Sequence, residues 1–229
     1  AIIQKKPVLI MSGEMPKEQI AMRLCCAMAP ADIGVLRNAP HKLPKEEFTA
    51  YTNAVVMLKN VPMQINDTSR PSIANIRESI RKTQHQYGLV GAVLVDYLQI
   101  MKTTKPFARE DLKIAYFTGE LKAMAKEFNC VIVLLSQLNR ELEKRPNKRP
   151  VLSDLRESGA IEQDADQIIF LYRDEIYNKE SQFRGIAEAI VGKNRHGEAG
   201  TAYMHAQLKY CQFTNLDHDA LNQIQGNLI

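Results

Sequence analysis

Apolar runs of strand length end just before three polar side chains, Glu14, Asp96 and Gln137. Ligands of open α/β sheets bind beyond the carboxyl ends of the parallel strands, where such side chains would gather. There one carboxylate can serve a Mg²⁺ ion, another can position a water molecule, and an amide can contact both a phosphate oxygen and that water. Taken singly, each residue is better explained as a turn or helix cap. Their joint occurrence favours a site for phosphoryl transfer to water.

Residues 90–101 (VGAVLVDYLQIM) are the stretch around which we organise this prediction. Residues 90–95 are almost wholly apolar, which predicts a strand covered on both faces, as in a parallel sheet. The acid Asp96 follows at once, so it is expected at the strand's carboxyl end. On this strand alone, a cap of the following turn is the favoured interpretation of Asp96.

Two cations follow a predicted strand at residues 186–191. Lys193 and Arg195 would point to the same side if the strand continued, because side chains alternate along a strand. Such a pair could reach the phosphates of a nucleotide on an adjacent subunit, as an arginine finger does. A solvated entry to a hairpin explains the spacing equally well.

Residues 139–159 form a long polar segment rich in cations. A flexible basic loop can follow a nucleic-acid phosphate backbone, with an affinity that depends on salt. Acidic residues are interspersed among the basic ones, and a run of charge is usually a solvated loop. The basic residues are Arg140, Lys144, Arg145, Lys148, Arg149 and Arg156.

Strand and helix patterns alternate through the first two-thirds of the chain, which indicates the α/β class. Helices are expected at residues 45–58, 73–87 and 111–128. The first of them should bury Phe48, Tyr51, Val55 and Leu58, and Gly88 should end the second. Near the end of the chain, residues 201–207 and 210–213 are typical of an antiparallel pair.

The composition fits one large soluble domain, which we place at residues 1–216, with a loose tail at 217–229. The chain has 229 residues, of which 45% are hydrophobic and 24% charged. It contains no apolar run of membrane-spanning length and no signal peptide, and its four cysteines lack metal-binding spacing. Reduced thiols and a cytoplasmic location are therefore expected. The net charge of +4 permits a nucleic-acid partner without establishing one.

The sequence contains no GxxxxGK[ST] motif, so nothing in it is expected to cradle β- and γ-phosphates as a P-loop does. The chain starts at Ala1 and enters a strand almost at once. We interpret it as a fragment, because a sheet without a central strand would expose an edge and much apolar surface.

Residues 153–166 (SDLRESGAIEQDAD) closely resemble a signature of the DnaB family, the replicative hexameric DNA helicases of bacteria and phages. The resemblance extends over about residues 7–216. It is carried by SGEMPKEQIAMRL, VLVDYLQIM, ELKAMAKEFNCVIVLLSQLNR, FLYRDEIYN and GIAEAIVGKNRHGEAGT. It implies a RecA-like motor domain: a mostly parallel twisted sheet flanked by helices, with a C-terminal antiparallel hairpin. It also implies a ring, expected to be a homohexamer, that uses ATP and Mg²⁺ and moves 5′ to 3′ along single-stranded DNA.

The resemblance implies a role for each matching residue. Glu14 is similar to the catalytic glutamate, Asp96 to the Walker B acid that serves Mg²⁺, and Gln137 to the glutamine that senses the γ-phosphate. Lys193 and Arg195 match the cations that enter the neighbouring subunit's nucleotide site.

The resemblance also implies DNA contacts and partners. Arg156, Glu157 and Gly159 fall in the loop that faces the central channel and grips DNA, and residues 102–109 match a second channel loop less specifically. Primase and a helicase loader are the implied partners, in the cytoplasm of a bacterial or phage-infected cell.

The sequence departs from the family pattern in two ways. Gly13 stands where leucine is usual, which could loosen the placement of Glu14. The first core strand, the P-loop, its helix and the N-terminal collar domain would all precede Ala1. A truncated motor domain is our leading interpretation, and a natural short paralogue is the alternative.

Two other functions stay open. The first is a non-hydrolysing module that binds single-stranded DNA or a helicase ring. The second is another RecA-fold ATPase, such as a recombinase or a clock-type protein, against which the 153–166 segment argues.

Overall fold

The computed structural model describes residues 1–155 and 159–217, and the chain divides into two compact units. Unit 1 comprises Ala1–Met22, Val55–Leu138 and Leu155–Ala165. Unit 2 comprises the other described residues. Each unit contains one four-stranded sheet.

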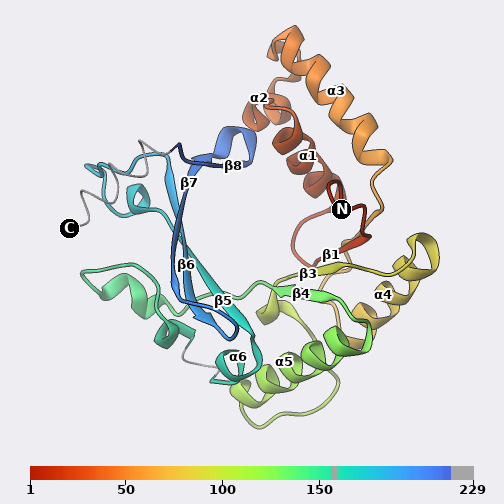
Figure 1. Cartoon of the computed structure of the whole chain (residues 1–229), viewed down its shortest axis with the longest axis vertical. Coiled ribbons are helices and arrows are strands. Elements are labelled where there is room, and N and C mark those ends of the chain that lie inside the picture. Colours follow the sequence, from red (N-terminus) through yellow and green to blue (C-terminus); the bar gives the residue numbers. More distant parts are fainter. Residues whose placement is uncertain (156–158, 218–229) are drawn as a thin grey trace. The chain divides into compact units, whose positions relative to one another are not determined.

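The sheet of unit 1 is parallel throughout and has the order β2-β1-β3-β4 (Figure 1). Parallel strands need crossover connections, and helices supply them here. The strands are β1 (Val8–Ser12), β2 (Met63–Asn66), β3 (Ala92–Asp96) and β4 (Val131–Leu134). All four carboxyl ends therefore lie along the same edge of this sheet.

Helices α4 (Ile73–Tyr87) and α5 (Glu110–Glu127) lie on one side of the parallel sheet in Figure 1. Their apolar faces form the main core together with the inner residues of β1 and β3. Ile76, Ile80, Phe117 and Met124 are almost completely inaccessible to solvent in this core. Burial of such a side chain stabilises the folded state by about 1.5–3 kcal/mol. This packing therefore holds the strands, and the edge formed by their carboxyl ends, in place against the two helices.

Local chemistry sets the ends of α4, as the sequence predicts. Ser72 accepts a hydrogen bond from the Asn75 backbone amide, and the Asn75 side chain accepts one from the Ser72 amide. This reciprocal pair is a capping box. Gly88 ends the helix with a φ of 91°, a conformation that glycine adopts without strain.

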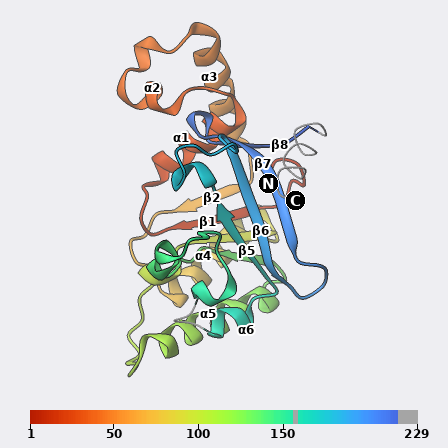
Figure 2. The same ribbon diagram turned by 90° about the vertical axis from the view of Figure 1, so that its left-hand side faces the viewer.

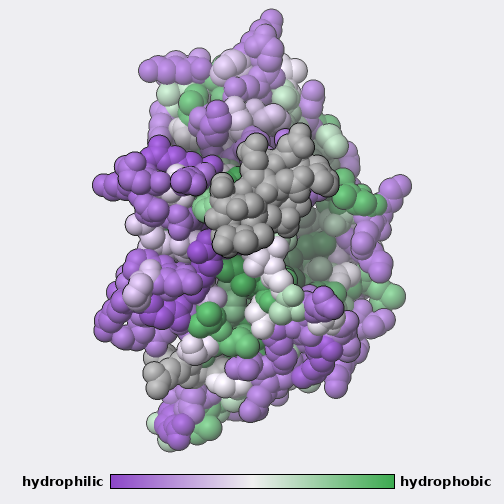
Figure 3. All heavy atoms as spheres, turned by 60° about the vertical axis from the view of Figure 1, so that its left-hand side comes forward, coloured by the Kyte–Doolittle hydropathy of each residue, from purple (hydrophilic) through white to green (hydrophobic). Residues whose placement is uncertain are grey.

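Strand β4 differs from the fully covered strand that its apolar run indicates. Val131, Val133 and Leu135 are 62%, 45% and 44% exposed, whereas the side chains between them are half-buried. Composition alone could not distinguish these cases, because helix α5 covers one face of β4 and alternation decides which residues it covers. Apolar side chains also reach the surface elsewhere, among hydrophilic ones (Figure 3).

The sheet of unit 2 is antiparallel with the order β5-β6-β7-β8. Its long strands run side by side in Figure 2. The predicted hairpin is present as β7 and β8, within this larger sheet. The strands are β5 (Gln167–Tyr172), β6 (Ile186–Asn194), β7 (Gly200–Gln207) and β8 (Gln212–Asn215).

Three further helices precede the second strand: α1 (Lys17–Met28), α2 (Ile33–Asn38) and α3 (Lys45–Lys59). The α2 helix was not predicted, because it is short and begins at the cap of Asp32 rather than in an apolar pattern. The expected inward face of α3 was wrong at Phe48, which is 52% exposed. The buried residue of this helix is Ala54.

Short 3₁₀ turns and one last helix complete the described chain. None of its helices has the length and apolar character needed to cross a membrane. The last helix is α6 (Gly159–Asp164), and the 3₁₀ turns are η1 (Pro40–Lys42), η2 (Leu98–Ile100), η3 (Arg140–Lys144), η4 (Leu152–Leu155), η5 (Asp174–Ile176) and η6 (Leu208–Tyr210).

Candidate functional site

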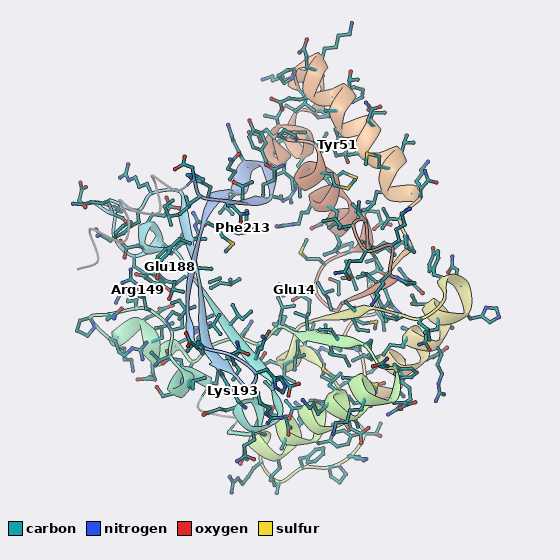
Figure 4. The ribbon with its side chains drawn as sticks, in the orientation of Figure 1. Glu14, Tyr51, Arg149, Glu188, Lys193 and Phe213 are labelled. Carbon is teal, nitrogen blue, oxygen red and sulfur yellow. The ribbon has the colours of Figure 1, made fainter. Side chains whose placement is uncertain are left out.

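Glu14 and Asp96 follow the ends of two adjacent strands of unit 1. In the register of β1 and β3, Ser12 lies opposite Asp96. The Gly13 amide continues this pairing, donating to the Asp96 carbonyl oxygen at 2.9 Å. Glu14 is exposed just beyond β1 (Figure 4), and Asp96 is half-buried. The two carboxylates therefore belong to one edge of the sheet.

Gln137 lies beyond the next strand of the same sheet. Its strand β4 pairs with β3, and the Leu135 amide donates to the Val95 carbonyl oxygen at 3.0 Å. The Gln137 side chain is exposed. The structure thus places all three predicted residues after neighbouring carboxyl ends, in the order Glu14, Asp96, Gln137.

Gln99 holds the loops after β3 and β4 together, a role that we did not predict. Its Oε1 accepts from the Gln137 amide at 3.2 Å, and its Nε2 donates to Ser136 Oγ at 3.0 Å. The Gln99 side chain therefore fixes the backbone of Gln137. A polar residue within the otherwise apolar stretch LQIM was the available signal.

Ser12 fixes the turn that carries Glu14. Its buried hydroxyl donates to the Met15 carbonyl oxygen at 2.9 Å and accepts from the Met15 amide at 3.1 Å. Beside this turn, a Cβ on Gly13 would lie 2.3 Å from Ile100 Cδ1. Ile100 therefore fills the space that a side chain at position 13 would need.

The end of β2 is joined to the same edge. Asp67, just after β2, accepts from the Lys17 amide at the start of α1, at 3.1 Å. A carboxylate is favourable there, because the first amides of a helix lack intrahelical partners. Asp67 thus anchors the segment that leads from Glu14 into α1.

The acidic residues at this edge fit Mg²⁺ better than a metal held by protein alone. Within residues 1–155 and 159–217, no cluster of three or more His, Cys, Asp or Glu could hold a metal ion. Mg²⁺ keeps several waters and is usually bound through one or two carboxylates and the substrate's phosphates. Asp96, half-buried at the strand end, can be such a carboxylate.

The family model of the DnaB-like helicase C-terminal domain matches residues 1–215. The chain belongs to this family. It is 42% identical over 217 residues to the replicative DNA helicase DnaB of Haemophilus influenzae, a match that covers 94% of the chain and 46% of that relative. It is 38% identical over 211 residues to DnaB of Geobacillus stearothermophilus, covering 92% of the chain and 46% of that relative.

Solved structures agree with this assignment. A DnaB-like replicative helicase, studied with its interactions with primase, matches 93% of the chain and 51% of its own length, with a TM-score of 0.89 and 35% identity. An ATPase domain matches 93% of the chain and 76% of its own length, with a TM-score of 0.88 and 35% identity. The RecA-like α/β fold is thereby confirmed. The chain spans about half the length (46–47%) of the curated relatives it matches.

The two predicted trans-acting cations of this DnaB-like chain lie in unit 2, at the end of β6. Lys193 is within the strand and faces Ile168 of β5, where the register shifts. Arg195 lies just beyond the strand and is ion-paired: its Nη1 is 3.0 Å from Asp166 Oδ1. Its amide also donates to the Asp166 carbonyl oxygen at 2.8 Å. This pairing across the end of β6 was not predicted.

Of the predicted DNA-binding residues, Arg156 and Glu157 lie outside the described part of the chain. Gly159 is the first residue of α6, which packs on α5 in unit 1. Among the residues that the structure describes, none outside the helix backbone lies within 4 Å of a Cβ placed on Gly159. The described packing therefore does not itself require glycine at this position.

The second predicted channel loop, residues 102–109, leads into α5 and carries a basic and aromatic cluster. Lys105 Nζ lies 4.2 Å from the centre of the Tyr116 ring. The Phe107 ring also lies 5.5 Å from that of Tyr116. Tyr116 belongs to α5, so the helix holds this loop as well as α6.

Residues 139–155 are not the flexible loop that their charge pattern suggested. Arg145 forms a bidentate pair with the buried Asp154, at 2.9 and 3.1 Å. Arg149 forms another with Glu188 of β6, at 2.7 and 2.8 Å, and Figure 4 shows these two side chains together. Both basic residues thus have acidic partners within unit 2, which sequence spacing could not reveal.

Aromatic and polar groups surround the Arg149–Glu188 pair. The guanidinium carbon of Arg149 lies 4.9 Å from the centre of the Tyr172 ring. The hydrogen bonds that the guanidinium N–H groups donate to Glu188 raise the pKa of Arg149. Burial, together with the hydrogen bond to Asp174, raises the pKa of Tyr172 to about 12. Hydrogen bonds from Ser181 and Tyr172 lower the pKa of Asp174. This network attaches residues 139–154 to the antiparallel sheet.

Proposed function

We propose that this chain is the motor domain of a replicative DNA helicase, with residues 1–216 as the domain. It would couple ATP hydrolysis at subunit interfaces to 5′–3′ movement on single-stranded DNA and to duplex unwinding. The observation that supports this most is the arrangement of Glu14, Asp96 and Gln137 after three neighbouring carboxyl ends of one parallel sheet. Membership of the DnaB-like family gives that arrangement its context.

Each of the three residues has a chemical task in this proposal. The Glu14 carboxylate accepts a hydrogen bond from the attacking water and polarises it. The Gln137 amide donates to an oxygen of the γ-phosphate, and its backbone is held by Gln99. Asp96 would hold Mg²⁺, which when bound neutralises charge on the β- and γ-phosphate oxygens.

The site is completed by the next copy of the chain in a ring, which we take to be a homohexamer. Lys193 and Arg195 of that copy would contact the phosphates and stabilise the charge of the transition state. Arg156, Glu157 and Gly159 would contact single-stranded DNA in the channel. Primase and a helicase loader are the proposed protein partners, and a solved relative is described with its primase interactions.

The Glu14→Gln variant of the full-length gene product tests this function. Because glutamine cannot act as a base, ATP hydrolysis should fall by about 100-fold or more while ATP affinity stays near the wild-type value. The exposed Glu18, on α1, provides a matched control: Glu18→Gln should hydrolyse ATP normally. Wild-type turnover in the Glu14→Gln variant would remove Glu14 from the catalytic role.

The alternative, a non-hydrolysing module that binds DNA or a helicase ring, makes a different prediction for the wild-type protein. The full-length gene product would then bind single-stranded DNA or the ring without hydrolysing ATP, with or without DNA. Hydrolysis that increases with single-stranded DNA would exclude it.

A further inference from the structure

Helix α5 connects the strands that carry two residues of the candidate nucleotide site, Asp96 and Gln137. It lies in the chain between β3, which ends at Asp96, and β4, which precedes Gln137. Phe117, Leu121 and Met124 bury its inner face in the main core. The helix is therefore seated firmly against the same sheet whose edge carries the three proposed nucleotide-binding residues.

The same helix holds the short helix α6, whose first residue is Gly159. The Thr118 hydroxyl donates to Asp164 Oδ2 at 2.6 Å, a distance typical of a hydrogen bond to a charged oxygen. The Ala115 carbonyl oxygen is 3.2 Å away, so the carboxylate is the better acceptor. Thr118 is only 6% exposed, which protects this bond from competition by water.

The Thr118 bond helps to fix the position of helix α6. With six residues, α6 is too short to be stable alone. Asp164 is its last residue, where the helix dipole disfavours a negative charge. The contacts of α6 include the Thr118 bond and the packing of Ile161 against the main core. Loss of the hydroxyl would therefore remove the hydrogen bond that joins the last residue of α6 to α5.

We infer that Thr118 is a positioning residue, which fixes α6 and Gly159 relative to the candidate nucleotide site so that bound DNA affects hydrolysis. This inference depends on the proposed function. Thr118 itself touches neither nucleotide nor DNA. It acts through Asp164, and its effect should appear in the response to DNA rather than in the chemistry of hydrolysis.

The Thr118→Val variant of the full-length gene product tests this inference, because valine keeps the shape but lacks the hydroxyl. We expect the concentration of single-stranded DNA that half-maximally stimulates ATP hydrolysis to rise about tenfold, as for loss of a hydrogen bond to a charged group. The rate without DNA should be unchanged. Thr118→Ser, which retains the hydroxyl, should restore the wild-type value.

A matched control is Thr52→Val on α3, whose hydroxyl donates to the Phe48 carbonyl oxygen of its own helix. It should respond to DNA as the wild type does. If Thr118→Val does not fold, Asp164→Asn replaces it, since an amide oxygen accepts more weakly; a severalfold rise in half-maximal DNA concentration is expected.

Three results would overturn the inference: a wild-type DNA response in Thr118→Val or in its substitute Asp164→Asn, an equal loss of the DNA-free rate, or failure of serine to restore the response. Failure of the proposed function is distinguishable from these, because wild-type protein would then show no DNA-stimulated hydrolysis at all.

Discussion

Replacing Arg149 with methionine would leave the Glu188 carboxylate without its cation. The Glu188 side chain is 6% exposed and that of Arg149 is 32% exposed. Breaking a buried pair by removing one partner costs about 3–5 kcal/mol. Because the guanidinium is partly solvated, we expect the lower end, about 3 kcal/mol. For a chain of this size, that loss lowers Tm by about 6–12 °C.

Thermal and urea unfolding followed by circular dichroism measure this loss. Lys144→Met is the matched control in the same segment, since Lys144 pairs with Glu141 on the exposed surface. It should leave Tm unchanged within error. The double variant Arg149→Met with Glu188→Met should recover most of the loss, because neither charge then remains buried. If Arg149→Met unfolds at the same temperature as Lys144→Met, the pair does not stabilise unit 2 and our reasoning is wrong.

Two further perturbations test other parts of the fold. The pKa of Asp174 is lower in the native state than its ordinary value of 3.8, so its ionised carboxylate stabilises the native state at pH values above 3.8. This contribution is lost as the pH falls through the lower, native-state pKa. Urea unfolding should therefore show wild type more stable than Asp174→Asn at pH 7 and the difference vanishing in acid; a constant difference would contradict this. Gly13→Ala should cost no more than about 1 kcal/mol, because Ile100 Cδ1 is the end of a flexible side chain and can move aside. Ile100→Val lacks that atom, so Gly13→Ala should cost much less in this background, and equal costs would refute the clash.

Local patterns predicted the helices and strands that local chemistry determines. Helix α4 begins at the Ser72 cap and ends at Gly88, and both signals stand in the sequence beside the helix. The three polar residues after apolar runs were also predicted to share an edge, because parallel strands align their carboxyl ends. The alignment of Ser12 with Asp96 agrees with that prediction.

Partners that are distant in sequence were not predictable. Gln99 contacts Ser136 and the Gln137 amide, and Arg149 contacts Glu188, 39 residues away. No spacing rule links such pairs. The outward position of Phe48 has a similar cause, since what packs beside α3 decides which of its faces is covered, and one helix's pattern does not contain that information.

The ion pair between Arg195 and Asp166 has a consequence for any phosphate that engages this arginine. The guanidinium already has a counterion, so recruitment exchanges one anion for another and gains only the difference between them. The singly charged Asp166 carboxylate competes poorly with a polyanion for the Arg195 guanidinium, but it competes well with a weakly charged ligand. Asp166 therefore makes Arg195 selective for ligands of high charge density over the weaker anions that a half-exposed arginine would otherwise bind.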